Sequence, residues 1–496
     1  MAPVTTNSQI SCEETFINEL PHTEEVKIIV HYGDFLDTPA LGELRIRLNC
    51  AVGVCNATGV ILFVEENCDD PLMTALAYDP YLKNFEVHVI SNKASEDAGS
   101  ASFYFPGFVD THIHASQYPN CGIFGDSTLL DWLETYTFPL ESSLSDENAA
   151  ALTYNAVISQ TLKHGTTCAA YYTTIHTNSS KIMADLCKLK GQRAFVGKVC
   201  MDQHSPSYYQ ETIQECKESS LELVKYILDE LNSPLVRPII TPRFAITCSS
   251  EMMTFLADVA EQFDVPIQTH LNENTSEIEF VKELFKDCES YTDVYRKHGL
   301  LNEKTVLAHC VHLEETEIKL IKEASAGISH CPISNSSLTS GECRVKELLK
   351  TGLKVGLGSD VSGGFTVSIL ENARQALLVS RHLAMTMDDS TKKEEVKLSV
   401  ADVLYLATMG GAKVLNLCGK IGTFDVGKEF DAQLIDLFAD KTNVSIFPWQ
   451  RVDKERLHSN GKDRVKMENI VAKWLFNGDD RNIKSVWIGG KLRHQN

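Results

Sequence analysis

The chain has 496 residues, of which 43% are hydrophobic and 23% charged, and its 46 basic and 67 acidic residues give a formal net charge of −21. This apolar fraction fits a folded protein with a full core and excludes wholesale disorder. The acidic balance disfavours general binding to the phosphates of nucleic acids. The length suggests roughly two to three domains, or one large barrel with an appendage.

Targeting signals and disulfides are not indicated. No stretch approaches the roughly 20 consecutive apolar residues of a membrane helix, and the first residues lack the basic and apolar segments of a secretory signal. The 15 cysteines form no Cys-x-x-Cys pair, which favours buried thiols in a reducing compartment. We therefore predict a cytoplasmic protein, with the nucleus as the alternative. Residues 1–25 have the composition of a polar N-terminal tail.

Both ends of the chain have sequence patterns typical of β-strands. Strand-like segments cover residues 27–33, 44–54, 60–66 and 85–90 near the N-terminus, and 431–437 and 485–492 near the C-terminus. Residues 438–483 between the last two are polar. These patterns predict a small β-sandwich domain built from both termini, over residues 26–100 and 420–496.

The middle of the chain alternates short apolar runs with amphipathic segments. One such segment, residues 211–232, places Leu223, Val224 and Ile227 on one helical face. The alternation predicts an α/β protein with a (β/α)8 TIM-type barrel over residues 101–419. The eight strand candidates are residues 105–111, 166–172, 194–200, 236–242, 266–271, 305–309, 326–330 and 354–359.

Residues suited to metal binding follow these runs, at the ends where a barrel carries its working residues. His112 and His114 lie two apart in the first run, so both face the same side. His270, His309 and Asp360 end the fifth, sixth and eighth runs. Three imidazoles and a carboxylate suit zinc, with one position left for water, and iron accepts the same ligands. Glu273 follows His270 by three residues, close enough to act on that water.

Several segments resemble the amidohydrolase superfamily: PGFVDTHIHASQYPN, TPRFA, QTHLNEN, LAHC, SHCPISNSSL and GLGSDVSGG. The narrower motifs HxHxSQY, TPRF and LLDWLETYTFP with SNSSLTSG are similar to the guanine deaminase family within it, in particular its fungal branch. The resemblance extends over about residues 26–496. It implies zinc-dependent hydrolytic deamination of guanine to xanthine and ammonia, in purine catabolism or salvage. It also implies a homodimer, while the acidic charge and the lack of a long apolar stretch predict neither nucleic acid nor a membrane as a partner.

The resemblance also implies roles for individual residues. Glu273 would be the proton shuttle, and His309 would steady the transition state. By its own chemistry, Asp360 beside the metal can orient the bound water or accept a proton from it. The implied zinc ligands are His112, His114, His270 and Asp360. The implied substrate-binding residues are Gln117, Arg243, Phe244, Glu273 and His309.

The chemistry of these residues agrees with that implication. Zinc lowers the pKa of a bound water to about 7, so a hydroxide can attack C2 of guanine while Glu273 moves protons to the ring and to the departing ammonia. Superfamily members with two metals bridge them through a carbamylated lysine at the end of the fourth strand. Arg243 stands there in this chain and stays protonated, so we predict one zinc per subunit.

The sequence leaves two other functions open. The chain could be a superfamily deaminase or chlorohydrolase that acts on another purine, a pterin or a triazine. It could also be a non-catalytic interaction scaffold, which the complete set of ligand-type residues disfavours. For Arg243, the alternative to reading a purine carbonyl is an ion pair with a barrel carboxylate.

Overall fold

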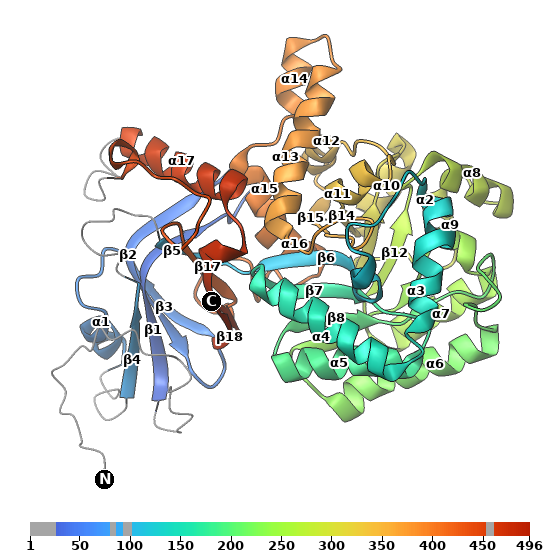
Figure 1. Ribbon diagram of the computed structural model, residues 1–496, viewed down its shortest axis with the longest axis horizontal. Coiled ribbons are helices and arrows are strands. Elements are labelled where there is room, and N and C mark those ends of the chain that lie inside the picture. Colours follow the sequence, from blue (N-terminus) through green and yellow to red (C-terminus); the bar gives the residue numbers. More distant parts are fainter. Residues whose placement is uncertain (1–25, 80–85, 93–101, 453–460) are drawn as a thin grey trace. The chain divides into compact units, whose positions relative to one another are not determined.

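The computed structural model describes residues 26–79, 86–92, 102–452 and 461–496 (Figure 1). The predicted tail, residues 1–25, lies outside these ranges. The chain divides into two compact units. Unit 1 draws on Met1–Asp37, Leu44–Pro106 and Thr423–Asn496, and unit 2 on Thr38–Glu43 and Gly107–Gly422. In the part of the chain that is described, no helix has the length and apolar character needed to cross a membrane.

Unit 1 consists mainly of strands. One sheet contains them in the order β18-β17-β16-β5-β1-β2-β3, and β4 also pairs with β1. The strands are β1 (Val26–Asp37), β2 (Arg45–Cys55), β3 (Ile61–Glu65), β4 (Glu86–Ser91), β5 (Ser102–Pro106), β16 (Ala432–Asp436), β17 (Ile483–Ile488) and β18 (Lys491–Gln495). The helices are α1 (Pro71–Tyr78) and α17 (Gly461–Asn477), with 3-10 turns η8 (Pro448–Gln450) and η10 (Asp480–Asn482).

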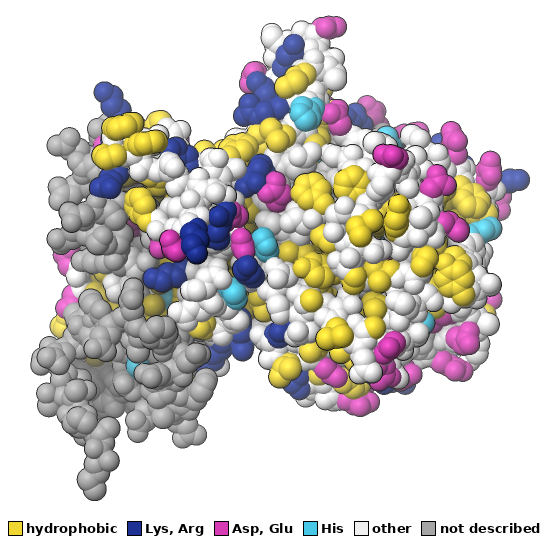
Figure 2. Space-filling model, viewed as in Figure 1, with side chains coloured by type: hydrophobic (Ala, Val, Ile, Leu, Met, Phe, Trp, Pro, Cys, Tyr) yellow, Lys and Arg dark blue, Asp and Glu magenta, His cyan; other side chains and the backbone are white. Residues whose placement is uncertain are grey.

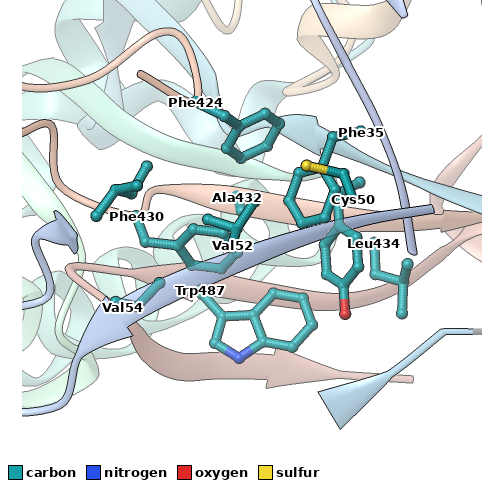
Figure 3. Close-up of a cluster of buried hydrophobic side chains, with 11 residues drawn as sticks. Phe35, Cys50, Val52, Val54, Phe424, Phe430, Ala432, Leu434 and Trp487 are labelled. Atoms are coloured by element: carbon teal, nitrogen blue, oxygen red, sulfur yellow. The ribbon is translucent and has the colours of Figure 1, made fainter. Parts of the chain in front are cut away.

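The core of unit 1 lies on both faces of β2, because successive residues of a strand point to opposite sides. Cys50, Val52 and Val54 pack with residues of the C-terminal strands, including Trp487, as Figure 3 shows. Ala51 faces the other way and packs with residues of β1, β3 and α1. Both termini of the chain therefore contribute to one core.

Two segments of unit 1 differ from the sequence-based expectation. The single strand expected over residues 485–492 is a hairpin, because Gly489 and Gly490 have φ values of 55° and 71° that suit a tight turn between paired strands. The polar stretch 438–483 contains helix α17. Its buried residues recur with helical spacing, a pattern present in the sequence: Met467, Ile470, Val471, Trp474 and Leu475.

Unit 2 alternates parallel strands with helices. Its strands are β6 (Phe108–His114), β7 (Thr166–Tyr172), β8 (Arg193–Gly197), β9 (Val199–Cys200), β10 (Val236–Pro238), β11 (Thr241–Pro242), β12 (Ile267–Leu271), β13 (Thr305–His309), β14 (Gly327–His330) and β15 (Lys354–Leu357). The α-helices are α2 (Leu129–Trp132), α3 (Phe138–Ser143), α4 (Glu147–Lys163), α5 (Thr177–Lys190), α6 (Ile213–Lys225), α7 (Ser250–Phe263), α8 (Thr275–Leu284), α9 (Tyr291–Lys297), α10 (Glu315–Ala324), α11 (Pro332–Ser337), α12 (Val345–Lys350), α13 (Ile369–Met385), α14 (Ser390–Val396), α15 (Val400–Tyr405) and α16 (Gly411–Val414). The 3-10 turns are η3 (Ala115–Asn120) and η6 (Ala245–Thr247), and the π-helical turns are η4 (Leu133–Thr137), η5 (Tyr226–Leu231) and η7 (Leu406–Gly410).

Three sheets, all parallel, order these strands: β10-β8-β7-β6, β11-β9 and β12-β13-β14-β15. Backbone contacts join them. Ile240 forms a parallel bridge with Ile267, and the N–H of Asp360 donates to the carbonyl of His112 at 2.9 Å. The helices lie outside the strands in Figure 1, as α4 and α5 do beside β7 and β8. The carboxyl ends of the strands consequently come to one side of unit 2.

The expected third and fourth strands of the barrel are each interrupted. Residues 194–200 form β8 and β9, and residues 236–242 form β10 and β11. Pro238 has no N–H to donate at the break. At Gly197 a side chain would collide with the chain, since an added Cβ would lie 1.9 Å from Oγ1 of Thr241. The expected helix over 211–232 is confirmed as α6 continued by η5, and a capping box at Thr212 begins it.

The acidic side chains and the cysteines are distributed as the composition suggests. Figure 2 shows Asp and Glu side chains dispersed over the visible face of unit 2, without one dominant patch. Every cysteine among the described residues is free, and most are buried.

Candidate active site

Four strand ends of unit 2 supply the predicted metal-type residues. Strand β6 carries His112 and His114, β12 carries His270, and β13 ends at His309. Asp360 lies three residues beyond β15 and is held to β6 through its backbone. All of these side chains are buried. The fold therefore brings together residues that are up to 248 positions apart in the sequence.

The carboxylate of Asp110 joins β6 to the segment after β15 through hydrogen bonds. It accepts bonds from the backbone N–H of His112 at 3.2 Å and of Ser359 at 3.0 Å, and from the hydroxyl of Ser359 at 2.5 Å. The bonds to Ser359 fix the segment after β15 to β6 and so place Asp360 beside the two histidines. Burial raises the pKa of Asp110 to about 7.

Ligand-type atoms of four residues converge on one point. Nε2 of His114 lies 3.1 Å from Nε2 of His270 and 3.4 Å from Oδ1 of Asp360, and Nε2 of His112 lies 2.9 Å from the same oxygen. Zinc bonds of ~2.0–2.1 Å in a tetrahedron separate ligand atoms by roughly 3.3 Å. The cluster His112, His114, His270 and Asp360 therefore has the donor set and the spacing of a metal centre.

The protonation of these groups also fits a metal. Nδ1 of His270 donates to the carbonyl of Arg243 at 2.6 Å, which leaves the lone pair on Nε2 to face the cluster. Burial lowers the pKa of His112, and it lowers those of His114 and His270 well below the usual value. Burial opposes ionisation of Asp360, but the neighbouring histidines hold its pKa well below its usual range. Neutral imidazoles and an ionised carboxylate are the forms that ligate metals.

Glu273 and His309 lie beside this cluster. Oε2 of Glu273 is 3.3 Å from Nε2 of His309, and Oε1 accepts from the hydroxyl of Ser340 at 3.2 Å. Burial raises the pKa of Glu273 to about 7, against the opposing charge of His309. Burial would lower the pKa of His309, but the carboxylates of Glu273 and Asp360 raise it. The side chain of Asn335 orients His309, because its oxygen accepts from Nδ1 at 2.9 Å.

The backbone is left-handed at several positions here. His309, Cys310 and Asp360 have φ values of 71°, 53° and 46°. Such values cost residues other than glycine some free energy, and they persist where surrounding contacts impose them. The N–H of Cys310 bonds to the carbonyl of Leu271 at 2.9 Å, so neighbouring strand ends supply those contacts.

A second buried cluster contains the predicted purine-binding residues. Gln117, on η3 directly after β6, donates through Nε2 to Glu141 at 2.8 Å. Arg243, directly after β11, forms an ion pair with the same carboxylate at 2.6 Å. The ion pair that was the alternative for Arg243 is therefore present, and Arg243 also lines the cavity described next.

One cavity joins the two clusters. It encloses about 390 Å³ of space not filled by atoms, part of which is open to solvent. The predicted site residues in its wall are His114, Gln117, Arg243, Phe244, His270, Glu273, His309 and Asp360, and its apolar wall contains Leu129, Trp132, Leu133 and Leu338. His112 lies behind this wall, in contact with Asp360. A lining that combines apolar side chains with a few convergent polar and titratable groups is typical of small-molecule sites.

Sequence reasoning missed several residues of the site. Glu141 lies two residues beyond the LLDWLETYTFP motif, and nothing in that motif predicts a role for its carboxylate. Glu277, in the first turn of α8, also lines the cavity, and no strand-end rule points to it. His330, the last residue of β14, and Lys198, between β8 and β9, are not among the residues that line this cavity, and Lys198 pairs with Glu211 at 2.6 Å.

The chain is similar in sequence to one family of proteins and to guanine deaminases. The sequence model of the Amidohydrolase family matches residues 103–493. A probable guanine deaminase of Schizosaccharomyces pombe is 44% identical over 467 residues, which cover 93% of this chain and 83% of that protein. The guanine deaminase of Dictyostelium discoideum is 42% identical over 458 residues, which cover 92% of this chain and 96% of that protein.

A solved structure is similar over nearly the whole chain. It is the crystal structure of guanine deaminase from C. acetobutylicum with bound guanine in the active site. The TM-score is 0.79 at 32% identity, and the match covers 94% of this chain and 99% of that one.

Proposed function

The chain belongs to the amidohydrolase family, and we propose that it catalyses the hydrolytic deamination of guanine to xanthine and ammonia. The observation that carries the proposal is the shared cavity. It places Arg243 and Gln117, which can read a carbonyl-bearing ring, in one wall with Glu273 and the cluster of metal-type residues. Similarity to guanine deaminases over more than 90% of the chain supports the same substrate.

We propose that His112, His114, His270 and Asp360 hold one zinc ion. When bound there, zinc supplies an acidified water, with a pKa of about 7, for attack on the carbon that bears the amine. Support for a single ion comes from the absence of a bridging lysine from the site that is described. Arg243 follows the fourth strand, and Lys198 is engaged by Glu211 through two bonds of 2.7 and 2.6 Å.

Glu273 moves the protons in this proposal. Its raised pKa, about 7, means that a substantial fraction of the carboxyl groups carries a proton at neutral pH. The protonated Glu273 donates to the ring nitrogen beside C2. Its carboxylate then takes the proton of the hydroxyl formed at C2 and passes it to the departing amine, which leaves as ammonia. His309, oriented by Asn335, presents Nε2 to the oxygen of the developing tetrahedral centre and stabilises the negative charge there.

Arg243, Gln117 and Phe244 hold the purine in this proposal. Arg243 has only donors, so it suits the C6 carbonyl of guanine and would face the amino group of adenine donor to donor. Gln117 offers both a donor and an acceptor to the neighbouring ring edge. Phe244, which is buried in the cavity wall, covers a face of the ring.

The architecture that we propose is the one expected from the sequence. The parallel strands β6 to β15 form one closed (β/α)8 barrel, which the contacts of Asp360 with His112 and of Ile240 with Ile267 support. Both termini form a composite β-sandwich domain, which the shared core around Trp487 supports. Free, mostly buried cysteines favour a cytoplasmic location, and the family resemblance favours a homodimer.

A substrate panel tests the proposed function. The zinc-loaded full chain is incubated separately with guanine, adenine, a pterin and a chlorinated triazine, and released ammonia or chloride is measured. We expect guanine to give by far the highest specificity constant. A higher value for another ring would replace guanine as the substrate, and no turnover of any ring would favour a non-catalytic scaffold.

A further inference from the structure

Glu141 is a fully buried carboxylate without a role in the function proposed above. It lies on the short helix α3, outside the cavity wall. Arg243 donates to its two oxygens at 2.6 and 3.4 Å, Gln117 donates at 2.8 Å, and the hydroxyl of Tyr209 donates at 2.9 Å. These four donors use the acceptor capacity of an ionised carboxylate, and three of them belong to Arg243 and Gln117, which line the cavity.

These bonds fix which way the amide of Gln117 points. An ionised carboxylate only accepts hydrogen bonds, so the group that faces Glu141 must be the NH2. The backbone N–H of Ser362 only donates, and it lies 3.1 Å from Oε1 of Gln117. The two atoms of the amide are therefore assigned without ambiguity. One N–H of Gln117 remains for a ligand. The second lone pair of Oε1 accepts only a long bond of 3.5 Å from the hydroxyl of Ser362, which a ligand N–H can replace.

The same carboxylate fixes the guanidinium of Arg243. Its two terminal nitrogens bond to Glu141, and its central carbon lies 5.2 Å from the ring centroid of Phe138, three residues before Glu141 on the same helix. The N–H groups not used by Glu141 are left for a ligand. The ion pair also compensates the positive charge of Arg243, which suits a neutral purine.

We propose that Glu141 is a positioning residue that sets the hydrogen-bonding pattern presented to the substrate, and so determines specificity for a purine with a carbonyl beside a ring N–H. This inference rests on the proposed function. Guanine offers an acceptor at O6 next to a donor at N1. Glu141 holds Arg243 and Gln117 in the pattern complementary to this edge of guanine, with donors from both residues and one acceptor from Gln117. A ring with an acceptor at N1 requires the amide of Gln117 to turn, which Glu141 and Ser362 oppose.

The test compares guanine with 2-aminopurine, which lacks the C6 oxygen and has an acceptor at N1. Glu141→Gln keeps the shape but brings an NH2 group to donors that need an acceptor. The matched control is Glu211→Gln, because Glu211 is likewise buried and paired with Lys198 at 2.6 Å but does not line the cavity. The full-length zinc-loaded proteins are assayed for kcat and KM with both substrates, for zinc content and for unfolding by urea.

We expect Glu141→Gln to lower kcat/KM for guanine by at least about tenfold, mainly through KM, and that for 2-aminopurine by less than about threefold. The ratio of kcat/KM for guanine to that for 2-aminopurine then decreases, while the zinc content stays at the parental level. Glu211→Gln should lose a comparable amount of stability and keep the parental ratio of kcat/KM for the two substrates. This difference between the two variants distinguishes a positioning role of Glu141 from a role in the stability of the fold alone.

Equal losses toward both substrates in Glu141→Gln would overturn the inference, as would the same narrowing in Glu211→Gln. If Glu141→Gln does not fold, Glu141→Asp decides. It keeps the buried charge but is one methylene too short to reach Gln117 and Arg243 together, so discrimination should again narrow, and an unchanged ratio overturns the inference. If the parent deaminates guanine but the Glu141 variants keep the parental ratio of kcat/KM for guanine to that for 2-aminopurine, only this inference is overturned. A parent without guanine turnover overturns the proposed function, and this inference with it.

Discussion

Replacing Arg243 with methionine removes the guanidinium and keeps an unbranched apolar stem. Arg243 is 2% exposed and Glu141 is 0% exposed, so solvent does not screen their ion pair. Breaking a buried pair by deleting one partner costs ~3–5 kcal/mol, because the other charge stays buried. Glu141 keeps its bonds from Gln117 and Tyr209, which places the expected loss near the lower end, ~3 kcal/mol.

Urea unfolding of the full chain measures this loss, and the double variant Arg243→Met/Glu141→Gln serves as the control. Without an uncompensated carboxylate, the double variant should be more stable than the sum of the two single losses predicts. An Arg243→Met protein within ~0.5 kcal/mol of the parent would refute the reasoning, since that range is typical of surface substitutions. Strictly additive losses would refute it as well.

The same variant should also lose activity. A lost charge-assisted bond to the C6 carbonyl is equivalent to ~1.5–3 kcal/mol in kcat/KM for guanine. Because each ~1.36 kcal/mol is a factor of ten, the expected decrease is roughly 10- to 150-fold. Assays at a temperature where the variant remains folded separate this effect from instability. A decrease in stability with unchanged guanine kinetics would show that Arg243 supports the fold and does not read the substrate.

Two further predictions concern the reacting groups. Glu273→Gln should retain the metal, because Glu273 is outside the ligand cluster, and should slow turnover at least ~100-fold through loss of the proton shuttle; near-parental turnover of guanine would make the assignment wrong. Chelation should abolish turnover, and elemental analysis of the active protein should find close to one zinc per chain, whereas two tightly held metals per chain would contradict the single-ion proposal.

The strand-end positions of the site follow from the sequence because the parallel arrangement is regular. His112, His270 and Asp360 each lie at or just after an apolar run, and parallel strands bring such ends to one side. Alternation along β6 places His112 and His114 on the same side of the strand. The long separations in sequence therefore did not hide the cluster.

Other features could not be reached in this way. Glu141 lies on a helix between β6 and β7, and only the tertiary fold shows that its carboxylate meets Arg243, 102 residues later. Helix α17 was present as the helical spacing of Met467, Ile470 and Trp474, which the polar composition around it concealed. The hairpin at Gly489 was likewise readable from two consecutive glycines, but the flanking apolar residues suggested one continuous strand.

Product analysis tests the central claim most directly. The zinc-loaded full chain is incubated with guanine, and xanthine and ammonia are quantified over time. The proposed function predicts both products in equal amounts as guanine disappears, with no formation after the metal is removed and with recovery when zinc is restored. Guanine left intact by a folded, zinc-loaded protein would contradict the proposal.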